Sequence, residues 1–475
     1  MSVATQANSA PALPTIQEVM TDPNLFGEQF GGESWSAWRM LLGAFYGLPV
    51  TQKDKRLWHT LTGRVHTPSE PADELWLAVG RRGGKSQCAA LLAVYEAAFR
   101  DYRPKLSPGE VATVMLLAAD RKQARTVMRY IGGLLHSNAM LARMIVREDR
   151  ESIELSNRTV IEVHTASYRA VRGYTIACVI ADEIAFWRSE DSANPDKEII
   201  QALRPAMATL GGKLLALSSP YAKKGELWQT HKTHFGKAGP VLVAQAPSRT
   251  MNPNLPQKVV DDALARDYDA ARAEYLAEFR SDLASFVARE VVDACVAPGR
   301  HELPYLREYR YSAFVDPSGG SADSMTLAIG HTEDRTVVVD AIREVRPPFS
   351  PESVVQEFAD LMHDYRITKV EGDRYGGEWP RERFTVHRIT YEPAAKPRSD
   401  LYRDLLPLLN AGRIELPDND RLTTQLCSLE RRTSRGGKDS IDHANGAHDD
   451  LANAVAGLAA MLSKRRYGGY TLANL

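Results

Sequence analysis

The stretch GRRGGKS at residues 80–86 contains the residue types that bind the phosphates of a nucleotide. Glycines let backbone N–H groups approach phosphate oxygens, a lysine reaches the outer phosphates, and a serine hydroxyl binds Mg²⁺. The residues of this stretch that would contact a nucleotide are Gly80, Arg82, Gly83, Gly84, Lys85 and Ser86. Their chemistry predicts a phosphate-binding loop.

The spacing of this loop departs from the usual pattern, because counting back from Gly84 across four residues reaches a valine instead of a glycine. Gly80, one step later, would permit the tight turn. An apolar stretch (residues 74–79) precedes the loop and a helical pattern (residues 87–99) follows it, which is the context of a P-loop. A basic turn between a strand and a helix is the alternative. The similar string SRGGKDS (residues 434–440) has no strand pattern before it and predicts an ordinary loop.

A second motif, ACVIADEIAF (residues 177–186), places two acids directly after an apolar stretch. An ATP-hydrolysing site needs one carboxylate near the metal ion and one that activates the attacking water. Asp182 fits the first role and Glu183 the second, although acids at such positions also cap helices. Because the two motifs occur in the required order, about a hundred residues apart, we expect ATP and Mg²⁺ to bind here.

Two further groups would complete this site. Arg172, ten residues before Asp182, would act on the nucleotide of a neighbouring subunit as an arginine finger. A surface arginine beside a turn glycine is the alternative. Ser218 and Ser219 follow another apolar stretch, and their hydroxyls would sense the outer phosphate.

The C-terminal half carries acids at the ends of apolar stretches. Asp316 follows YSAFV, and Asp373 follows ITKVEG, which itself contains Glu371. Asp449 and Asp450 open an Ala-rich helical pattern. Cleavage of a phosphodiester by two metal ions needs carboxylates from separate elements around cations about 3.5–4 Å apart. Each acid alone is more often a cap or turn residue, but together they predict a site for two Mg²⁺ or Mn²⁺ ions.

Basic residues accompany these acids and are candidates for contacts with the phosphates of DNA. A solvated charged face is the alternative for each of them. The set is Arg374, Arg381, Arg383, Lys396, Arg398, Arg403, Arg431, Arg432, Arg435 and Lys438. His443 and His448 are further candidates beside the acids, although hydrogen-bonded surface histidines are commoner.

The elements that must position these residues follow an α/β pattern. Short apolar stretches alternate with helical patterns in the N-terminal half, as in the parallel sheet of a P-loop (RecA/ASCE-like) ATPase. In the C-terminal half, three strand patterns followed by a helix and a further strand predict an RNase H-like α/β nuclease domain. The expected strands are residues 74–79, 111–119, 158–165, 177–182 and 213–219, then 309–316, 325–331, 335–345 and 367–373.

The chain of 475 residues exceeds what one hydrophobic core usually organises, so we expect two domains. A buried amphipathic helix is predicted over residues 34–47, after a capping Ser34. The expected segments are a lead-in (1–33), the P-loop ATPase domain (34–250), a helical junction (251–305), the RNase H-like nuclease domain (306–463) and a tail (464–475).

Composition limits the surface and the compartment. The formal net charge of −1 and the pI of about 6.9 provide no general positive field, so nucleic-acid binding would depend on local Arg and Lys clusters. The four cysteines lack a CxxC pair, which argues against a zinc ribbon or a disulfide framework. No apolar run reaches membrane-spanning length, and the N-terminus lacks a signal-peptide pattern. We therefore expect a cytoplasmic protein without membrane partners.

Six motifs in order, VGRRGGKS, RGYTIACVIADE, LALSSP, VDPSGG, GDRYGG and HDDLANA, resemble the large terminase subunit of tailed double-stranded DNA bacteriophages. The resemblance covers residues 34–461. It implies a motor that uses ATP to pump viral DNA into a preformed capsid, and a nuclease that cuts concatemeric DNA. It also implies ATP with Mg²⁺ in the first domain and Mg²⁺ or Mn²⁺ in the second.

Roles for single residues of the motor follow from the resemblance. Arg81 matches an arginine that acts on the nucleotide of its own subunit, and Arg172 matches the finger that acts on a neighbour. Ser218 and Ser219 match the motif that couples hydrolysis to DNA movement. Trp38, followed by an arginine, stands where the family has a glutamine that contacts adenine.

The resemblance assigns the nuclease metals in the same way. Asp316, Asp373 and Asp450 match the metal-binding acids of the family, with Glu371 and Asp449 as the alternatives. Carboxylates on two strand ends and one helix start are thus the expected ligands.

The implied partners are double-stranded DNA, the portal protein of the procapsid, a small terminase subunit and further copies of the chain in a ring, expected to be a pentamer. The tail would dock on the portal, and the implied location is the host cytoplasm. A cellular DNA-repair helicase with a nuclease domain is one alternative, but only one RecA-like core fits before residue 250. A non-catalytic DNA-binding assembly protein is the other, and the complete set of Lys85, Ser86, Asp182 and Glu183 counts against it.

Overall fold

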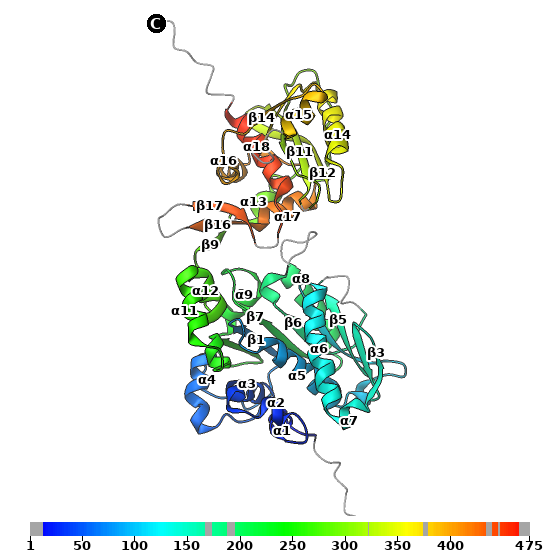
Figure 1. Ribbon diagram of the computed structural model, residues 1–475, viewed down its shortest axis with the longest axis vertical. Helices are drawn as coiled ribbons and strands as arrows, with labels where there is room; N and C mark the ends of the chain where they lie inside the picture. The colour runs from blue at the N-terminus through cyan, green and yellow to red at the C-terminus, as the bar shows by residue number, and fades with distance from the viewer. Residues whose placement is uncertain are drawn as a thin grey trace, which may run out of the picture. The chain divides into compact units, whose positions relative to one another are not determined.

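The computed structural model describes residues 13–166, 173–187, 195–321, 323–373, 379–433, 439–444 and 447–464. The chain forms two compact units that divide between Ser281 and Asp282. Figure 1 shows the elements of each unit with their labels. The expected arginine finger and three of the expected DNA-binding residues lie outside the described residues, namely Arg172, Arg374, Arg435 and Lys438.

The first unit contains an eight-stranded sheet in the order β3-β4-β5-β2-β6-β7-β1-β8. Six neighbouring strands of this sheet, β5, β2, β6, β7, β1 and β8, run parallel. β4 and β3 add an antiparallel edge beside β5. Every residue of β2 and β6 is buried, as expected for strands covered on both faces. The strands are β1 (Glu74–Val79), β2 (Ala112–Ala118), β3 (Ile145–Glu148), β4 (Ser152–Leu155), β5 (Thr159–Thr165), β6 (Ile176–Asp182), β7 (Lys213–Ser218) and β8 (Val241–Ala246).

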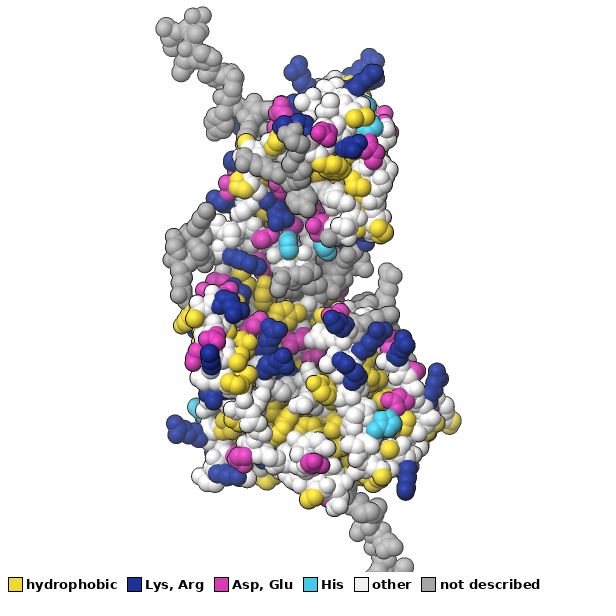
Figure 2. All heavy atoms as spheres, viewed as in Figure 1, with side chains coloured by type: hydrophobic (Ala, Val, Ile, Leu, Met, Phe, Trp, Pro, Cys, Tyr) yellow, Lys and Arg dark blue, Asp and Glu magenta, His cyan; other side chains and the backbone are white. Residues whose placement is uncertain are grey.

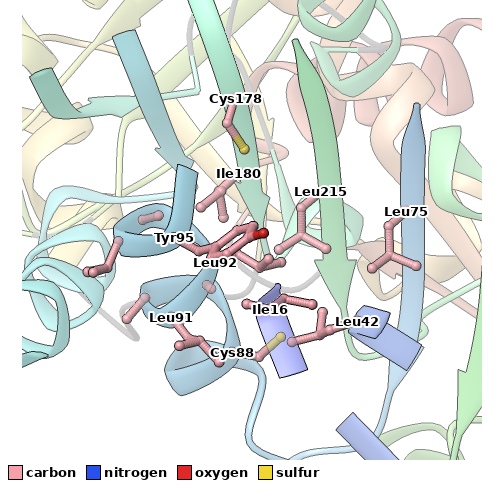
Figure 3. Close-up of a cluster of buried hydrophobic side chains, with 14 of the residues drawn as sticks. Ile16, Leu42, Leu75, Cys88, Leu91, Leu92, Tyr95, Cys178, Ile180 and Leu215 are labelled. Carbon is pink, nitrogen blue, oxygen red and sulfur yellow. The ribbon is translucent and has the colours of Figure 1, made fainter. Parts of the chain in front are cut away.

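Helices cover both faces of this sheet. One face packs against α1, α3, α5 and α6, and the other packs against α8, α9 and the segment around Trp187. In Figure 3, Leu91, Leu92 and Tyr95 of α5 lie beside Ile180 and Leu215 of the sheet. The α-helices are α1 (Ile16–Thr21), α2 (Gly27–Phe30), α3 (Ser36–Phe45), α4 (Lys55–Thr62), α5 (Lys85–Ala98), α6 (Arg121–Ser137), α7 (Ala139–Ala142), α8 (Pro195–Met207), α9 (Gly225–His234), α10 (Ser248–Met251), α11 (Gln257–Arg266) and α12 (Tyr268–Leu276). The short 3₁₀ turns are η1 (Glu33–Trp35), η2 (Gln52–Asp54), η3 (Arg103–Lys105) and η4 (Ile184–Phe186).

Two segments at the ends of this unit differ from the expected division of the chain. The expected lead-in of residues 1–33 contains α1, which starts at a Thr15 capping box, and both Ile16 of α1 and the later Phe26 are buried in the core. Helices α11 and α12, expected in the junction, belong to the first unit. The expected helix after Ser34 is present as α3, but its N-cap is Trp35 without a side-chain hydrogen bond.

The second unit is built on a six-stranded sheet in the order β14-β13-β10-β11-β12-β15. β10, β11 and β12 form an antiparallel meander, while β13 joins β10 and β14 in parallel. This strand order is that of the RNase H-like fold. The strands are β10 (Ser312–Asp316), β11 (Met325–Glu333), β12 (Thr336–Val345), β13 (Lys369–Gly372), β14 (Thr390–Pro393) and β15 (Ile414–Glu415).

A separate three-stranded sheet joins β9 (Leu283–Ser285), β16 (Leu429–Thr433) and β17 (Asp439–His443). The GGK-containing string of residues 434–440 therefore follows a strand, contrary to the sequence pattern. Residues 434–438 themselves lie outside the described part of the chain.

Two helical layers enclose the RNase H-like sheet. α18 packs with Phe314 on one face, and α14 packs with Val315 on the other. Figure 1 shows α14 and α18 on the two sides of the strands. The helices of this unit are α13 (Arg289–Asp293), α14 (Pro351–Asp364), α15 (Trp379–Val386), α16 (Arg398–Asn410), α17 (Asp420–Ser428) and α18 (Asp450–Lys464).

Gly457 lets α18 approach the sheet closely. A Cβ atom at this position would lie 2.4 Å from three ring atoms of Phe314, which is itself fully buried. Phe314 precedes Asp316 by two residues on β10, and Gly457 lies two helical turns after Asp450. The contact therefore sets how near the first turn of α18 comes to the end of β10.

We expect Gly457→Ala to destabilise the second unit by about 1–3 kcal/mol, because the added methyl group overpacks the Phe314 contact. Thermal unfolding followed by circular dichroism would show a lower Tm. Gly133→Ala in α6 is the matched control, since a Cβ there meets nothing within 4 Å and alanine favours helices. An unchanged Tm for Gly457→Ala would contradict the close packing.

Candidate nucleotide site and candidate nuclease site

The expected phosphate-binding loop lies between β1 and α5, where β1 ends at Val79 and α5 starts at Lys85. Gly84 has φ of 93°, a conformation that favours glycine, and Gly80 is confined by packing. A Cβ on Gly80 would lie 2.3 Å from the Oγ of Ser248. Val79, the last residue of β1, stands in place of the usual first glycine. The next residue, Gly80, is the one that needs to lack a side chain, because Ser248 lies so close to it.

Lys85 is buried and points back across the loop. Its Nζ donates to the carbonyl of Val79 at 3.1 Å and to the Oγ of Ser219 at 2.9 Å. The same Nζ lies 3.4 Å from an oxygen of Glu183. Ser86 is half-buried as the second residue of α5. The structure thus brings Lys85, Glu183 and Ser219 together.

Glu183 is fixed at the end of β6 by the strand beside it. Its Oε2 accepts hydrogen bonds from the Oγ of Ser218 at 2.9 Å and from the backbone N–H of Ser219 at 3.1 Å. Its φ of 49° is unusual for a residue with a side chain and is typical of residues at functional sites. The two serines therefore contact the expected catalytic base directly.

Asp182 is buried and incompletely paired. Its Oδ2 accepts from the Nε2 of Gln123 at 3.4 Å, and its Oδ1 has no hydrogen-bond partner among the described residues. Burial, and then the charge of Glu183, raise the pKa of Asp182 to about 7. A buried carboxylate oxygen without a partner is costly unless a cation or water meets it, so Asp182 fits a Mg²⁺ ligand.

The two arginines of the loop are exposed, whereas Lys85 is buried. Arg81 is largely exposed and pairs with Glu274 of α12 at 3.2 Å, and its backbone N–H donates to the carbonyl of Glu274. Arg82 is exposed with φ of 63°, and its carbonyl accepts from Asn252 at 2.9 Å. A contact between Arg81 and a bound nucleotide would require Arg81 to leave Glu274.

Trp38 contacts the loop itself, whereas the sequence placed it only at the position of an adenine-contacting glutamine. It is fully buried and its indole Nε1 donates to the carbonyl of Gly83 at 2.9 Å. The same nitrogen lies 3.0 Å from where a Cβ on Gly84 would be. Trp38 therefore supports the loop from behind, and the only available signal was a buried aromatic residue in the helix before the motif.

We expect Trp38→Phe to raise the Kd for ATP by about fivefold, because loss of one hydrogen bond worth about 1 kcal/mol loosens the loop. Binding of a fluorescent ATP analogue would measure the change. Trp58→Phe is the matched control, since Trp58 is also buried in this unit and donates to the carbonyl of His66 at 3.2 Å. Equal affinity of the two variants would remove Trp38 from the site.

In the second unit, Asp316 and Asp373 lie at the ends of neighbouring parallel strands. Val315 of β10 pairs with Gly372 of β13, so the next residue on each strand is one of these acids. The Nδ2 of Asn453 donates to Asp316 at 2.8 Å and to Asp373 at 3.2 Å. The structure thus brings both predicted acids together through a residue of α18 that sequence reasoning missed.

Asp449 and Asp450 have different surroundings although they are adjacent. Asp449 accepts from Arg398 at 3.0 Å and from Tyr402 at 2.7 Å, so it is already held. Asp450 is buried, and its Oδ2 has no hydrogen-bond partner among the described residues. Of the two, Asp450 has the oxygen available to a cation.

Glu371 shares a sheet face with the other acids but lies further from the strand end. It pairs with Phe314 of β10, whose side chain faces α18, and Asp373 lies two residues further along. Glu371 therefore lies two residues away from the edge where Asp316 and Asp373 meet.

Burial and neighbouring acids raise the pKa values of Asp316 and Asp450. Burial, followed among charges by Asp373 and Asp450, raises the pKa of Asp316 well above its ordinary value. Burial and then Asp449 raise the pKa of Asp450 to about 6. Divalent cations compete with protons for such carboxylates. Among the described residues, no group of three or more His, Cys, Asp or Glu side chains is positioned to hold a metal ion.

Many of the expected DNA-binding residues are paired with acids. Arg398 contacts Asp442 as well as Asp449, and Lys396 contacts Asp404 at 2.6 Å. Further pairs are Arg383 with Glu352, Arg403 with Asp400 and Arg431 with Asp439. His443 lies 3.0 Å from the carbonyl of Ala444. Basic and acidic side chains are interspersed on the face shown in Figure 2, in keeping with the neutral net charge.

These two units define the class of the protein: a P-loop fold with an RNase H-like fold after it in one chain. The strand order β8-β1-β7-β6-β2 of the first unit is that of the ASCE group of P-loop proteins, and β14-β13-β10-β11-β12 is that of RNase H-like nucleases. No helix of the described residues is long and apolar enough to cross a membrane.

The chain is similar to solved structures of bacteriophage large terminases, the family that its motifs resemble. The large terminase of HK97 is 16% identical, with a TM-score of 0.36, over 82% of this chain and 91% of that one. A large terminase from a thermophilic bacteriophage, in complex with ADP, is 13% identical, with a TM-score of 0.37, over 82% and 93%. The nuclease of phage G20c with bound magnesium is 16% identical, with a TM-score of 0.32, over 37% and 96%. No family model and no curated protein sequence matches the chain.

Proposed function

We propose that this chain is a phage DNA-packaging enzyme that hydrolyses ATP to move double-stranded DNA into a procapsid and cuts concatemeric DNA. The observation that carries the proposal is the presence of two acid-bearing sites in one chain. Each lies where the strands of its own sheet end, one beside a phosphate-binding loop and one beside the start of α18. Carboxyl ends of parallel strands are the usual place for such sites.

In the first site, Lys85 would bind the phosphates, while Ser86 and Asp182 would hold Mg²⁺. The bound ion would neutralise charge on the phosphates during hydrolysis. Glu183 would take the proton of the attacking water, with its carboxylate oriented by Ser218 and the N–H of Ser219. Through these two serines, Glu183 would be connected to β7, the strand beside β6. Such a connection is what the coupling role of Ser218 and Ser219 requires.

The loop and two arginines would complete catalysis. The backbone N–H groups of Arg82 and Gly84 would contact the phosphates. Those of Gly80 and Gly83 donate to the carbonyls of Ala246 and Gly80, both at 3.1 Å, so these two glycines would contribute room for the phosphates at the loop. Arg81 would leave Glu274 to contact the nucleotide of its own subunit, and Arg172 would act on the nucleotide of a neighbouring copy.

In the second site, Asp316, Asp373 and Asp450 would hold two Mg²⁺ or Mn²⁺ ions. The Oδ2 of Asp450, which has no hydrogen-bond partner in the described ranges, and the clustered charges support this set, and Glu371 and Asp449 are the alternatives. The ions would activate water and stabilise the leaving oxygen of the phosphodiester. Asn453 would keep Asp316 and Asp373 together.

The same proposal includes the partners. They are double-stranded DNA, the portal of the procapsid, a small terminase subunit and further copies of the chain in a ring, a pentamer by resemblance. The work would take place in the host cytoplasm, where procapsids are filled.

Selective loss of the two activities tests this proposal. Lys85→Ala is expected to lower ATP hydrolysis by at least about a hundredfold and to leave cutting of plasmid DNA with Mn²⁺ intact. Asp373→Asn is expected to do the reverse. Wild-type protein with neither activity would support a non-catalytic assembly protein instead, and loss of both activities in each variant would point to misfolding rather than to two sites.

A further inference from the structure

The second unit has a cavity that the two candidate sites do not use. Its volume is about 900 Å³, and it lies beside Tyr311 at the start of β10, the β11–β12 turn and the end of α14. Asp316 lies at the other end of β10. Five steps along the strand at about 3.4 Å each put the cavity roughly 17 Å from the acids.

Arginines dominate the charge of this cavity. Arg307, Arg310, Arg335 and Arg366 line it against two carboxylates, Glu308 and Asp334, which leaves an excess of two positive charges. In the described part of the chain, none of these four guanidinium groups takes part in an ion pair or a side-chain hydrogen bond. Unpaired guanidinium groups around a hollow are suited to an anionic ligand.

Two of the arginines occupy backbone positions that favour glycine. Arg335 has φ of 79° in the β11–β12 turn, and Arg366 has φ of 58° after α14. Arg158 has a similar φ of 63°, but its guanidinium donates to the carbonyls of Ser107 and Glu110. Within the described residues, Arg335 and Arg366 have no such intramolecular use, although glycine would be the less strained residue at both positions.

Tyrosine rings form a fixed wall of the cavity. Tyr309 lies against the ring of His331 with centroids 4.0 Å apart, and its hydroxyl donates to Glu333 at 2.8 Å. Tyr311 packs on the edge of Tyr365 at 5.1 Å. These contacts fix the outline of the cavity beside its basic groups.

We infer that this cavity binds the phosphodiester backbone of DNA at a distance from the cutting site, with Arg335 and Arg366 as phosphate contacts. The inference rests on the proposed nuclease function. The cavity and the acids lie at opposite ends of β10, a strand that is covered by helices on both faces, so the segment of DNA in the cavity would differ from the segment at the acids. The cavity would then hold one segment of the DNA while the acids cut another.

Binding of a fluorescein-labelled duplex of about 20 base pairs to the full chain, in EDTA so that no cutting occurs, tests the cavity. Arg335→Gly and Arg366→Gly are each expected to weaken binding about five- to tenfold and to lower the salt slope of log K by about one. Arg388→Gly is the matched control, since Arg388 has φ of 60°, lies in the same unit and is outside the cavity. It is expected to change the Kd by less than about twofold.

Three results would overturn the inference. The first is equal binding by the two cavity variants and Arg388→Gly, and the second is an unchanged salt slope. The third is displacement of the duplex by dTMP in wild type but not in the cavity variants, which would assign the cavity to a free nucleotide. Weaker binding by the variants with no cutting by wild type in Mn²⁺ would retain the cavity and refute the nuclease.

Discussion

Glu183→Gln is expected to lower ATP hydrolysis by about 10²–10⁴-fold while ATP still binds, because glutamine keeps the shape of the side chain but cannot accept a proton. The carboxylate is held by Ser218 and Ser219, and its other oxygen lies 3.4 Å from the Nζ of Lys85. Steady-state phosphate release with Mg²⁺ and binding of a fluorescent ATP analogue would separate the two effects.

Glu151→Gln is the matched control for this experiment. Glu151 lies in the same unit, is half-buried and forms a 3.4 Å pair with Arg125, so hydrolysis should remain at the wild-type rate. Hydrolysis by Glu183→Gln at the wild-type rate would show that another group activates the water. The proposed role of Glu183 as the catalytic base would then be wrong.

Asp316→Asn is expected to reduce Mn²⁺-dependent cutting of plasmid DNA by about 10²–10³-fold, through loss of a metal ligand worth several kcal/mol. The metal-free protein should not lose stability. Burial raises the pKa of Asp316 in the folded state, so its ionised form destabilises the fold at any pH above that raised pKa. Asparagine removes this charge and still accepts from Asn453, so the Tm in EDTA is expected to stay equal or rise.

Asp449→Asn is the comparison variant for Asp316→Asn. It changes an acid of the same site that is already bonded to Arg398 and Tyr402. It breaks the ion pair with Arg398 and weakens the bond from Tyr402, so we expect a lower Tm. The concentration of Mn²⁺ that gives half-maximal cutting should stay near the wild-type value. A large rise in that concentration with an unchanged Tm would make Asp449 the ligand in place of Asp450.

The sequence was sufficient for the strands that carry the motifs and for their order along the chain. The expected strands at 74–79, 177–182 and 213–219 are present as β1, β6 and β7, and the meander of the second unit is present as β10 to β12. Long apolar runs of parallel strands are recognisable because both faces are buried. The short antiparallel strands β3 and β4 escaped notice, since they carry exposed residues and no motif follows them.

The direction in which a side chain points could not be predicted from the sequence. The loop motif predicts Gly80, Lys85 and Ser86 at a strand-to-helix turn, because backbone conformation there depends on local residue type. The same motif contains Arg81, which points to Glu274, a residue 193 positions later. No local pattern contains that contact.

What the sequence determined by itself is therefore the order of two folds and the acids at their strand ends. The resemblance favoured Asp450 with Asp449 as the alternative, but only the tertiary structure shows how the surroundings of the two differ, because adjacent aspartates are identical in type and differ by one step of a helix. That step turns Asp449 toward Arg398 and leaves an oxygen of Asp450 without a partner among the described residues. Its position also depends on how closely α18 packs on Phe314, a contact between residues more than a hundred positions apart.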